Sequence, residues 1–396
     1  MSGPLVYTDT ATLPFEILGH IFSHVVGGYP IYLRALFFVC RSWYNAVRYH
    51  SVLWTDIRFD GVVANHFDFS TRFSGSLAEN YYRCCLAYSG TAPLDVAVES
   101  KFLILFRRKE SVLHIRNNIT LIIKTFLGES GEHALRWRSF NWMIGHAHKD
   151  GVNGCLSIFP QMLPRLQTLR MHSLWGAPSR PRFPHCSQLT TVEFYQTHGD
   201  PLQDDDFLRV QKLSLGKNTI WFPKDVVLLS RFRNILHLTL YSLSKNVLFH
   251  SNSHPIHSQS VSLVHLRTLV LQGIVPKEPV TALRTPSLQE VCFNHPHSFQ
   301  HLRCPPFTGT VHSIHVTVPE VDGSTQFSVE MESLLSALPA LTSVFIPRWL
   351  FLQLETTRFE LDARTKGLMV IVEDEINHFC LVHRAQYTAY DQCTPT

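Results

Sequence analysis

A short pattern, apolar-x-x-apolar-x-apolar, recurs along most of this 396-residue chain and strongly limits how the chain can fold. Its two best copies, Leu163 to Met171 and Leu263 to Leu271, match almost residue for residue. Other copies are Leu189/Val192/Phe194, Val210/Leu213/Leu215, Ile235/Leu238/Leu240, Leu288/Val291/Phe293, Val311/Ile314/Val316 and Leu341/Val344/Ile346, with Trp137/Phe140/Trp142 as an earlier candidate. Such self-similarity is typical of stacked repeats.

The copies are spaced by a nearly constant length. Their first apolar residues stand at 166, 189, 210, 235, 266, 288, 311 and 341, which gives intervals of 23, 21, 25, 31, 22, 23 and 30. These values centre on the ~20–29-residue period of leucine-rich repeats. The two apolar residues one position apart share one face of a short strand. One unit cannot bury that face alone, so we expect neighbouring units to stack into a curved, mainly parallel sheet.

We assign this leucine-rich-repeat-like solenoid to residues 91–372. It begins at the alternating segment Thr91 to Val98 and ends with a last strand at 367–372. A helix is expected near Leu77–Leu86, another over 349–366, and a polar cap or tail over 373–396. The Asn or Cys that usually follows a repeat strand is missing, and Leu174 stands there instead. An ordinary α/β domain with regularly spaced strands therefore remains the alternative.

Composition narrows the class of protein. Charged residues make up only 17% of the chain against a usual ~25%, which indicates extensive burial or apolar surface that a partner covers. The net charge of +4 is too small to indicate nucleic-acid binding. The nine cysteines form no Cys-x-x-Cys, and no apolar run approaches the ~18–20 residues of a membrane span. We therefore expect a reduced protein of the cytoplasm and/or nucleus, with no membrane partner.

The first sixty residues have a different character. Thr12 is positioned to cap a helix that starts near Pro14, carries Glu16 in its first turn and ends at Gly27-Gly28-Tyr29-Pro30. A second helix is expected to carry Leu33, Leu36, Phe37, Val39, Cys40, Trp43, Ala46 and Val47, and Ser51 to Trp54 closes the segment. About 45 residues with three helical pieces have more apolar positions than they can bury alone. The alternative is an N-terminal cap of the larger domain.

Three motifs in this segment decide how we interpret it. They are Leu13-Pro14-x-Glu16-Ile17-Leu18-x-x-Ile21-Phe22, then Val39-Cys40-Arg41-x-Trp43, then Leu53-Trp54. In this order and spacing, residues 12–57 resemble an F-box of the form abundant in mushroom-forming fungi. Phe15 departs from the commoner Pro, and Gly27 to Pro30 lengthens the first connection. Leucine-rich repeats commonly follow the F-box in such proteins, which agrees with the repeat pattern.

The resemblance implies both a partner and a contact face. In that family the F-box binds the Skp adaptor, which joins it to a cullin-RING ubiquitin ligase. By residue match the adaptor-binding set is Leu13, Pro14, Glu16, Ile17, Leu18, Ile21, Phe22, Val39, Cys40 and Trp43. Some of these are expected to lie in the core of the module, Trp43 first among them, and Trp54 is expected to lie there too. Residues 58–90 are then a helical linker.

A protein substrate is expected to contact the open face of the sheet. Side chains between the inward apolar positions point outward from the strands. These are Arg170, Glu193, Ser214, Thr239, Val270, Cys292, His315 and Phe345. Their mixed charge and two apolar members fit a protein or peptide better than a phosphate backbone.

Signals for chemistry are weak. The sequence contains no phosphate-binding loop, no Gly-x-Ser-x-Gly and no His-Glu-x-x-His. Two histidine clusters, at His250/His254/His257 and at His295/His297/His301 with Cys304, match no familiar metal spacing and are expected to be solvated loops. Asp204-Asp205-Asp206 is either a cation site or a polar helix start. No metal, cofactor or catalytic residue is therefore predicted.

The sequence thus predicts an α+β or α/β chain: a small three-helix F-box followed by an irregular repeat solenoid. Its expected function is that of a non-catalytic substrate-recognition subunit of a Skp-cullin-F-box E3 ubiquitin ligase, which recruits an unknown protein for ubiquitination. One alternative is an interaction scaffold that feeds no ligase. A more remote alternative is a hydrolase with an unfamiliar site, which a deep pocket with converging His, Asp and Ser or Cys side chains would indicate.

Overall fold

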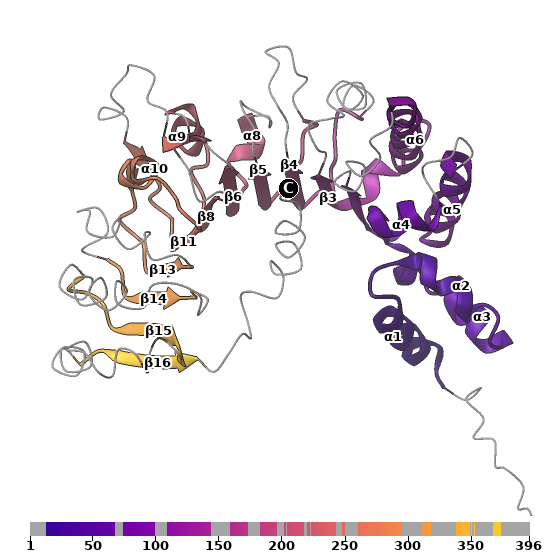
Figure 1. Cartoon of the computed structure of the whole chain (residues 1–396), viewed down its shortest axis with the longest axis horizontal. Coiled ribbons are helices and arrows are strands. Elements are labelled where there is room, and N and C mark those ends of the chain that lie inside the picture. The colour runs from indigo at the N-terminus through magenta and orange to yellow at the C-terminus, as the bar shows by residue number, and fades with distance from the viewer. Residues whose placement is uncertain are drawn as a thin grey trace, which may run out of the picture. The chain divides into compact units, whose positions relative to one another are not determined.

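The structure is a computed structural model of the whole chain (Figure 1). It describes residues 13–67, 74–99, 109–143, 159–172, 183–195, 202, 204–217, 220–221, 223–242, 248–249, 260–294, 310–317, 338–348, 350, 352 and 367–373. The chain divides into two compact units, Met1–Val210 and Gln211–Thr396, which are described in turn. The predicted helix over 349–366, both histidine clusters and the predicted tail at 373–396 lie wholly or almost wholly outside the described residues.

The first unit begins with helix α1 (Phe15–Val26). Pro14, which we placed in the first turn, is the N-cap instead. Thr12, the predicted cap, lies outside the described residues. Glu16 lies in the first turn, where the helix dipole favours a carboxylate. Gly27 ends the helix in the left-handed conformation (φ 56°), which a residue without a Cβ adopts at little cost.

The single second helix that we predicted is wrong, because the chain breaks there. It forms a 3-10 turn η2 (Pro30–Tyr32), a short α2 (Leu33–Leu36) and then, after a break at 37–40, helix α3 (Arg41–Tyr49). Cys40 is fully extended at φ −161° and ψ 171°. After the break, α3 packs against α1 and buries Ala46 and Val47.

The helical module runs directly into the sheet. The 3-10 turn η3 (Ser51–Trp54) is followed after one residue by strand β1 (Asp56–Phe59), which pairs in parallel with β2 (Leu94–Glu99). The sheet thus begins one strand before residue 91, where we had expected it to start. Between β1 and β2 lie α4 (Gly61–His66), capped by the Asp60 carboxylate, and α5 (Ser74–Tyr88), which confirms the predicted helix over 77–86.

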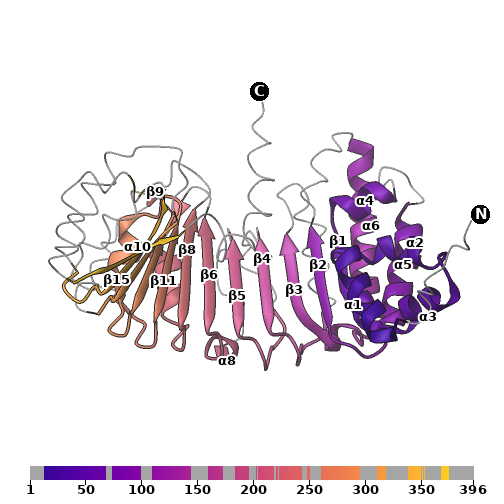
Figure 2. The same cartoon turned by 90° about the horizontal axis from the view of Figure 1, so that it is seen from below.

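The rest of the first unit alternates strands with helices or turns. Helix α6 (Lys109–Leu127) packs on α5, and Tyr82 meets Phe126 edge to face with ring centroids 4.7 Å apart. The turn η5 (Ala134–Arg136) then leads into the strands. These are β3 (Trp137–Met143), β4 (Thr168–His172) and β5 (Thr191–Tyr195), followed by the short α8 (Asp204–Phe207). Figure 2 shows β2 to β5 side by side.

The second unit continues the same plan. Its main strands are β6 (Lys212–Lys217), β8 (His237–Ser242), β11 (Thr268–Gln272), β13 (Glu290–Phe293), β14 (Ser313–Val316), β15 (Ser343–Pro347) and β16 (Met369–Glu373). Helices α9 (Pro223–Leu229) and α10 (Lys277–Thr281) lie in the connections. Two small parallel pairs accompany them, β7 (Ile220–Trp221) with β9 (Leu248–Phe249) and β10 (Val261–Ser262) with β12 (Leu283–Arg284).

The repeat prediction is confirmed. Among the described residues, the main strands form one twelve-stranded parallel sheet in the order β1-β2-β3-β4-β5-β6-β8-β11-β13-β14-β15-β16. All eight strand segments that the pattern predicted lie inside these strands. The first apolar residues of seven copies are completely buried; they are Leu166, Leu189, Val210, Ile235, Leu266, Leu288 and Val311. The eighth, Leu341, is half-buried.

The packing of α1 on η3 gives a stability prediction. Gly19 is buried, and a Cβ added there would lie 1.7 Å from Cδ2 of His50, whose ring is held edge-on by Phe15 at 5.5 Å. Gly19→Ala should therefore overpack this contact and cost about 1–3 kcal/mol. Amide hydrogen exchange of α1 in the full chain measures the loss. In a His50→Ala chain, which lacks the overlapping ring, Gly19→Ala should cost much less stability than it does in the wild-type chain. Equal losses in the two backgrounds would contradict the contact.

Candidate functional site

Helix α1 carries two apolar stripes, and only one of them is buried in its own module. The inner stripe is completely or almost completely buried and consists of Leu18, Phe22 and Val26. The outer stripe has exposed fractions of 46%, 42% and 60%, and consists of Ile17, Ile21 and Val25. Both stripes follow the four-residue spacing of a helix face. The two stripes lie side by side, about 100° apart around the helix, so the apolar surface of α1 extends well beyond the part that its own module buries.

The inner stripe is held by aromatic contacts. Phe22 meets the Trp43 ring edge to face at 4.9 Å. The buried Trp54 donates its indole N–H to the Val47 carbonyl over 2.7 Å, and so ties η3 to α3. Trp54 is thus a core residue as predicted, whereas Trp43 is half-buried. These contacts fix the orientation of α1 and with it the direction of the outer stripe.

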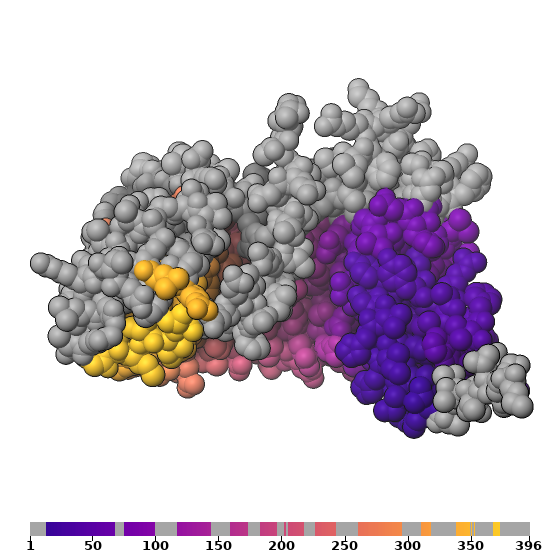
Figure 3. All heavy atoms as spheres, turned by 60° about the horizontal axis from the view of Figure 1, so that its bottom comes forward, coloured from indigo at the N-terminus to yellow at the C-terminus, as the bar shows by residue number. Residues whose placement is uncertain are grey.

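Further apolar side chains are exposed at the break between α2 and α3. Phe38 is 81% exposed, and Val39 and Cys40 are exposed beside it, with the Cys40 thiol free. Leu13 and Pro14 are exposed at the start of α1. This much uncovered apolar surface on one small module is a usual mark of an interaction site. The helical module is at the indigo end of the chain in Figure 3.

The structure sorts the predicted adaptor-binding residues by exposure. The exposed members are Leu13, Pro14, Glu16, Ile17, Ile21, Val39 and Cys40. Leu18 and Phe22 are buried, so within the free chain they support the surface and do not form part of it. The predicted adaptor-binding set did not include Val25 and Phe38, although the four-residue spacing from Ile17 and Ile21 already points to Val25.

The predicted substrate-facing side chains alternate along the strands with the inward apolar residues of the repeats, and so lie on the opposite side of the sheet. Strand register aligns Thr239, Val270, Cys292, His315 and Phe345 in one row of the second unit, and Arg170 with Glu193 in the first. Ser214 pairs with Thr239. Most are half-buried, but Cys292 and Glu193 are buried, with Glu193 only 7% exposed.

Arg170 and Glu193 neutralise each other. Arg170 Nε lies 3.3 Å from the Glu193 carboxylate, and His172 Nε2 lies 3.6 Å from its other oxygen. His172 also packs against the Tyr195 ring at 5.1 Å. Glu193 is thus committed to interactions within the sheet, and Arg170 offers a ligand less free charge than the sequence suggested.

A second polar cluster lies on β11, β13, β14 and β15. The Glu290 carboxylate lies 2.8 Å from His315 Nε2 and accepts a 3.0 Å hydrogen bond from the Thr268 hydroxyl. The bond from His315 is the main reason that the pKa of Glu290 is lowered. His315 stacks flat on Phe345, with centroids 3.9 Å apart. The sequence did not predict the roles of Glu290 and Thr268, because only the strand register brings them beside His315.

This cluster is not arranged as a hydrolase site. Ser313 Oγ lies 3.3 Å from His315 Nε2, the same ring nitrogen that faces Glu290. A histidine that activates a serine contacts the hydroxyl with one nitrogen and its acid with the other. The geometry therefore does not supply a base-activated nucleophile.

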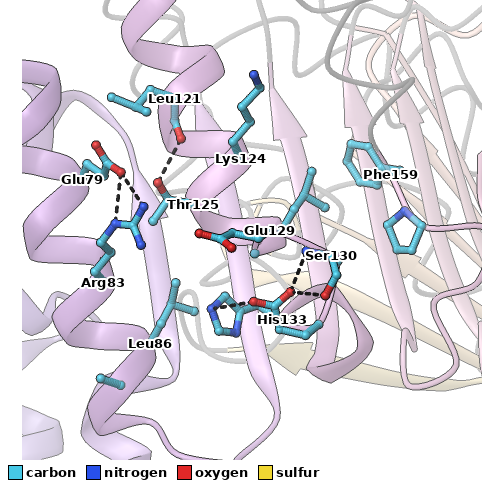
Figure 4. A pocket seen from close by; sticks show the side chains of 16 residues that line it. Glu79, Arg83, Leu86, Leu121, Lys124, Thr125, Glu129, Ser130, His133 and Phe159 are labelled. Atoms are coloured by element: carbon cyan, nitrogen blue, oxygen red, sulfur yellow. Dashed lines mark hydrogen bonds and ion pairs between the residues drawn. The ribbon is translucent and has the colours of Figure 1, made fainter.

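A pocket of about 890 Å³ lies between α5, the end of α6 and the loop at 128–133 (Figure 4). Ser130 donates its hydroxyl to the Glu132 carboxylate over 2.9 Å, and His133 lies 3.8 Å from the other oxygen. Backbone hydrogen bonds, first of Glu132 itself and then of Ser130, lower the pKa of Glu132 to about 2, while burial lowers that of His133. Serine and histidine both approach the acid here, so this pocket also lacks a serine–histidine pair that could act as nucleophile and base.

The aspartate triplet is a helix start. Helix α8 begins at Asp204, and Asp206 is fully buried. Its carboxylate accepts the Cys186 N–H at 3.1 Å and lies 2.9 Å from His185 Nδ1. Burial raises the pKa of Asp206. These contacts tie α8 to the loop before β5, which is a structural role. In the described part of the chain, no group of three or more His, Cys, Asp or Glu side chains could hold a metal ion.

A comparison with known protein families finds a match to the helical module. The family model described as F-box-like matches residues 10–60, which include α1, α2, α3, η3 and β1. The N-terminal part of the chain is therefore F-box-like, a domain typical of non-catalytic ligase adaptors. No curated protein matches the chain. Among the described helices, none combines the length and the apolar character that a bilayer crossing requires.

The commitment of Glu193 inside the sheet can be tested by its removal. Glu193→Ala leaves Arg170 and His172 without their acid in a largely desolvated position, and should cost about 1–3 kcal/mol of stability. Urea-induced unfolding of the full chain measures the effect. Glu129→Ala, at an exposed glutamate of the same unit, is the matched control and should change stability by less than ~0.5 kcal/mol. Equal effects of the two substitutions would show that the Glu193 pairing contributes nothing.

Proposed function

We propose that this chain is the substrate-recognition subunit of a Skp-cullin-F-box E3 ubiquitin ligase. Its F-box-like module binds a Skp adaptor, and its leucine-rich-repeat-like sheet holds a protein substrate for ubiquitination by the other subunits. The observation that carries the proposal is the outer apolar stripe of α1, exposed on a module that the F-box-like family model matches. An adaptor that covers the stripe would remove this surface from water, which is the main driving force of such association.

The adaptor contact face consists of the exposed members of the predicted set. These are Leu13, Pro14, Glu16, Ile17, Ile21, Val39 and Cys40, to which we add Val25 and Phe38. Leu18, Phe22 and Trp43 hold this face in place from below. Between residues 13 and 55 the charged side chains are Glu16 against Arg34, Arg41 and Arg48. A partner of this module would therefore combine an apolar with an acidic surface.

The chain itself transfers nothing in this proposal. Its contribution is to hold a substrate within reach of a cullin-RING enzyme, so it needs no catalytic residue, metal or cofactor. A scaffold that binds the adaptor without a ligase is the competing function, and recovery of a cullin together with the chain separates the two.

The outer stripe provides the decisive substitution. Ile17→Ser/Ile21→Ser removes apolar contact of about 1–2 kcal/mol per side chain, so adaptor affinity should fall at least ~30-fold. Because both residues are exposed, the module should stay folded. The measurement is recovery of the Skp adaptor and cullin with the purified full chain, together with titration of the chain with the adaptor.

Two further variants complete this test. Leu77→Ser/Val227→Ser makes the same kind of change at exposed apolar residues of α5 and α9 and should leave adaptor binding unchanged. Leu18→Ala/Phe22→Ala should instead unfold the module, which hydrogen exchange of α1 would report. Unchanged adaptor recovery from Ile17→Ser/Ile21→Ser would refute the contact face. A wild-type chain that recovers no Skp adaptor would refute the proposed function.

A further inference from the structure

The N-terminal edge of the strands in the second unit is strongly basic. This edge comprises residues 211–212, 233–237, 264–268 and 286–290, at the starts of β6, β8, β11 and β13. It carries five exposed basic or titratable side chains, which are Lys212, Arg233, His237, His265 and Arg267. The strands β6 and β8 run side by side in the same direction (Figure 2), and Lys212 is aligned with His237 across them.

Across the described residues, none of these five side chains forms an ion pair with an Asp or Glu, although Glu290 acts electrostatically on His237. Three of them also lie close enough to affect one another: after burial, the nearby Lys212 and then Arg267 help to lower the pKa of His237, while Glu290 opposes them. Unpaired cations that repel one another produce a positive potential that attracts anions.

The one acidic residue on this edge is already occupied. Glu290 is the only Asp or Glu in the four segments that make up the edge. Its carboxylate is held by His315 and Thr268 at the far end of the row that begins with Lys212 and His237. One carboxylate that is shared in this way offsets only part of the positive charge of Lys212, Arg233 and Arg267.

The row of side chains beyond this edge is uncharged and partly apolar. Thr239, Val270 and Cys292 lead to the stacked pair of His315 and Phe345. A ligand that lies across the strands would therefore meet cations along one side and apolar atoms along the other. Neighbouring strands are ~4.8 Å apart, so Lys212 at the start of β6 and Arg267 just before β11, two strands away, lie within reach of about three residues of an extended peptide.

We propose that this edge binds an acidic peptide segment, whose Asp or Glu carboxylates pair with Lys212, Arg233 and Arg267 while neighbouring apolar side chains lie on Val270 and Phe345. This inference rests on the proposed function only in naming the peptide a part of the substrate. A peptide fits better than a nucleic acid, because the row beside the cations is partly apolar and the net charge of the chain is only +4.

The binding test uses the purified full chain without any adaptor. The probe is a fluorescent peptide of alternating Glu and Val, with a Lys and Val peptide of equal length as its counterpart. Anisotropy should show binding of the Glu peptide that weakens as salt is raised, and much weaker binding of the Lys peptide. Lys212→Glu/Arg267→Glu should weaken binding of the Glu peptide at least about tenfold.

A charge-matched control removes the general effect of net charge. Lys277→Glu/Lys124→Glu changes the net charge by the same amount at exposed lysines on α10 and α6, and should change affinity less than about twofold. Equal losses in both double variants, or none in Lys212→Glu/Arg267→Glu, would overturn the proposal.

Two more probes identify the source of the anion. A peptide with phosphoserine in place of Glu, and an oligothymidylate of equal charge, are measured at the same salt concentration. Binding of the phosphopeptide without the Glu peptide, or tighter binding of the oligonucleotide than of the Glu peptide, would overturn it. Because no adaptor is present, these results are independent of adaptor recovery, so failure here can be told from failure of the proposed function.

Discussion

In each repeat of this protein, strand register places inward apolar side chains against those of the next strand. In the second unit Leu238, Leu269, Val291, Ile314 and Val344 are aligned in one continuous row and are completely buried. A repeat of 21 to 31 residues could not bury such a row alone, so each strand depends on both of its neighbours. The same alternation leaves the intervening side chains on the open face, which is why Thr239, Val270 and Cys292 form a regularly spaced row there.

The F-box-like module is joined to the sheet by its own last residues, which form strand β1. Ile57 and Phe59 of β1 are buried with the sheet, while Arg58 on the other face pairs with Asp56 over 2.6 Å. Tyr29 places its ring 5.5 Å from the Arg58 guanidinium and donates its hydroxyl to Asp60 over 2.8 Å. Burial and this bond raise the pKa of Tyr29 to about 12. The loop after α1 is thereby anchored on the first strand.

Gly28 makes that anchoring sterically possible. Its φ is 84°, and a Cβ there would lie 2.8 Å from the Asp56 carboxylate. The Gly27-Gly28-Tyr29-Pro30 connection, which the sequence marked only as a longer link, therefore docks the helical module on β1. The predicted boundaries at 12–57, 58–90 and 91–372 remain predictions, but β1 shows that the sheet extends into the segment that the F-box-like match covers.

The sequence was sufficient for what local periodicity determines. The apolar pattern located strands such as β4 and β11, and the Leu-Pro-x-Glu motif located α1. It could not reveal the break at Cys40, because Phe38 and Val39 continue the apolar pattern of the preceding helix. The change in chain direction after them depends on the packing of α3 against α1. The pairs Arg170–Glu193 and Glu290–His315 were also missed. Inserts of varying length separate these residues, and only the strand register shows that they are neighbours.

The central claim is that the outer stripe of α1 contacts the adaptor, and site-specific photo-cross-linking tests it most directly. A benzophenone amino acid is placed at Ile21 on the outer stripe or at Leu77 on α5, and the full chain is irradiated with a Skp adaptor. The account predicts a cross-linked adaptor from position 21 and none from position 77. An adaptor that binds the chain but cross-links only from position 77, or from neither position, would contradict it.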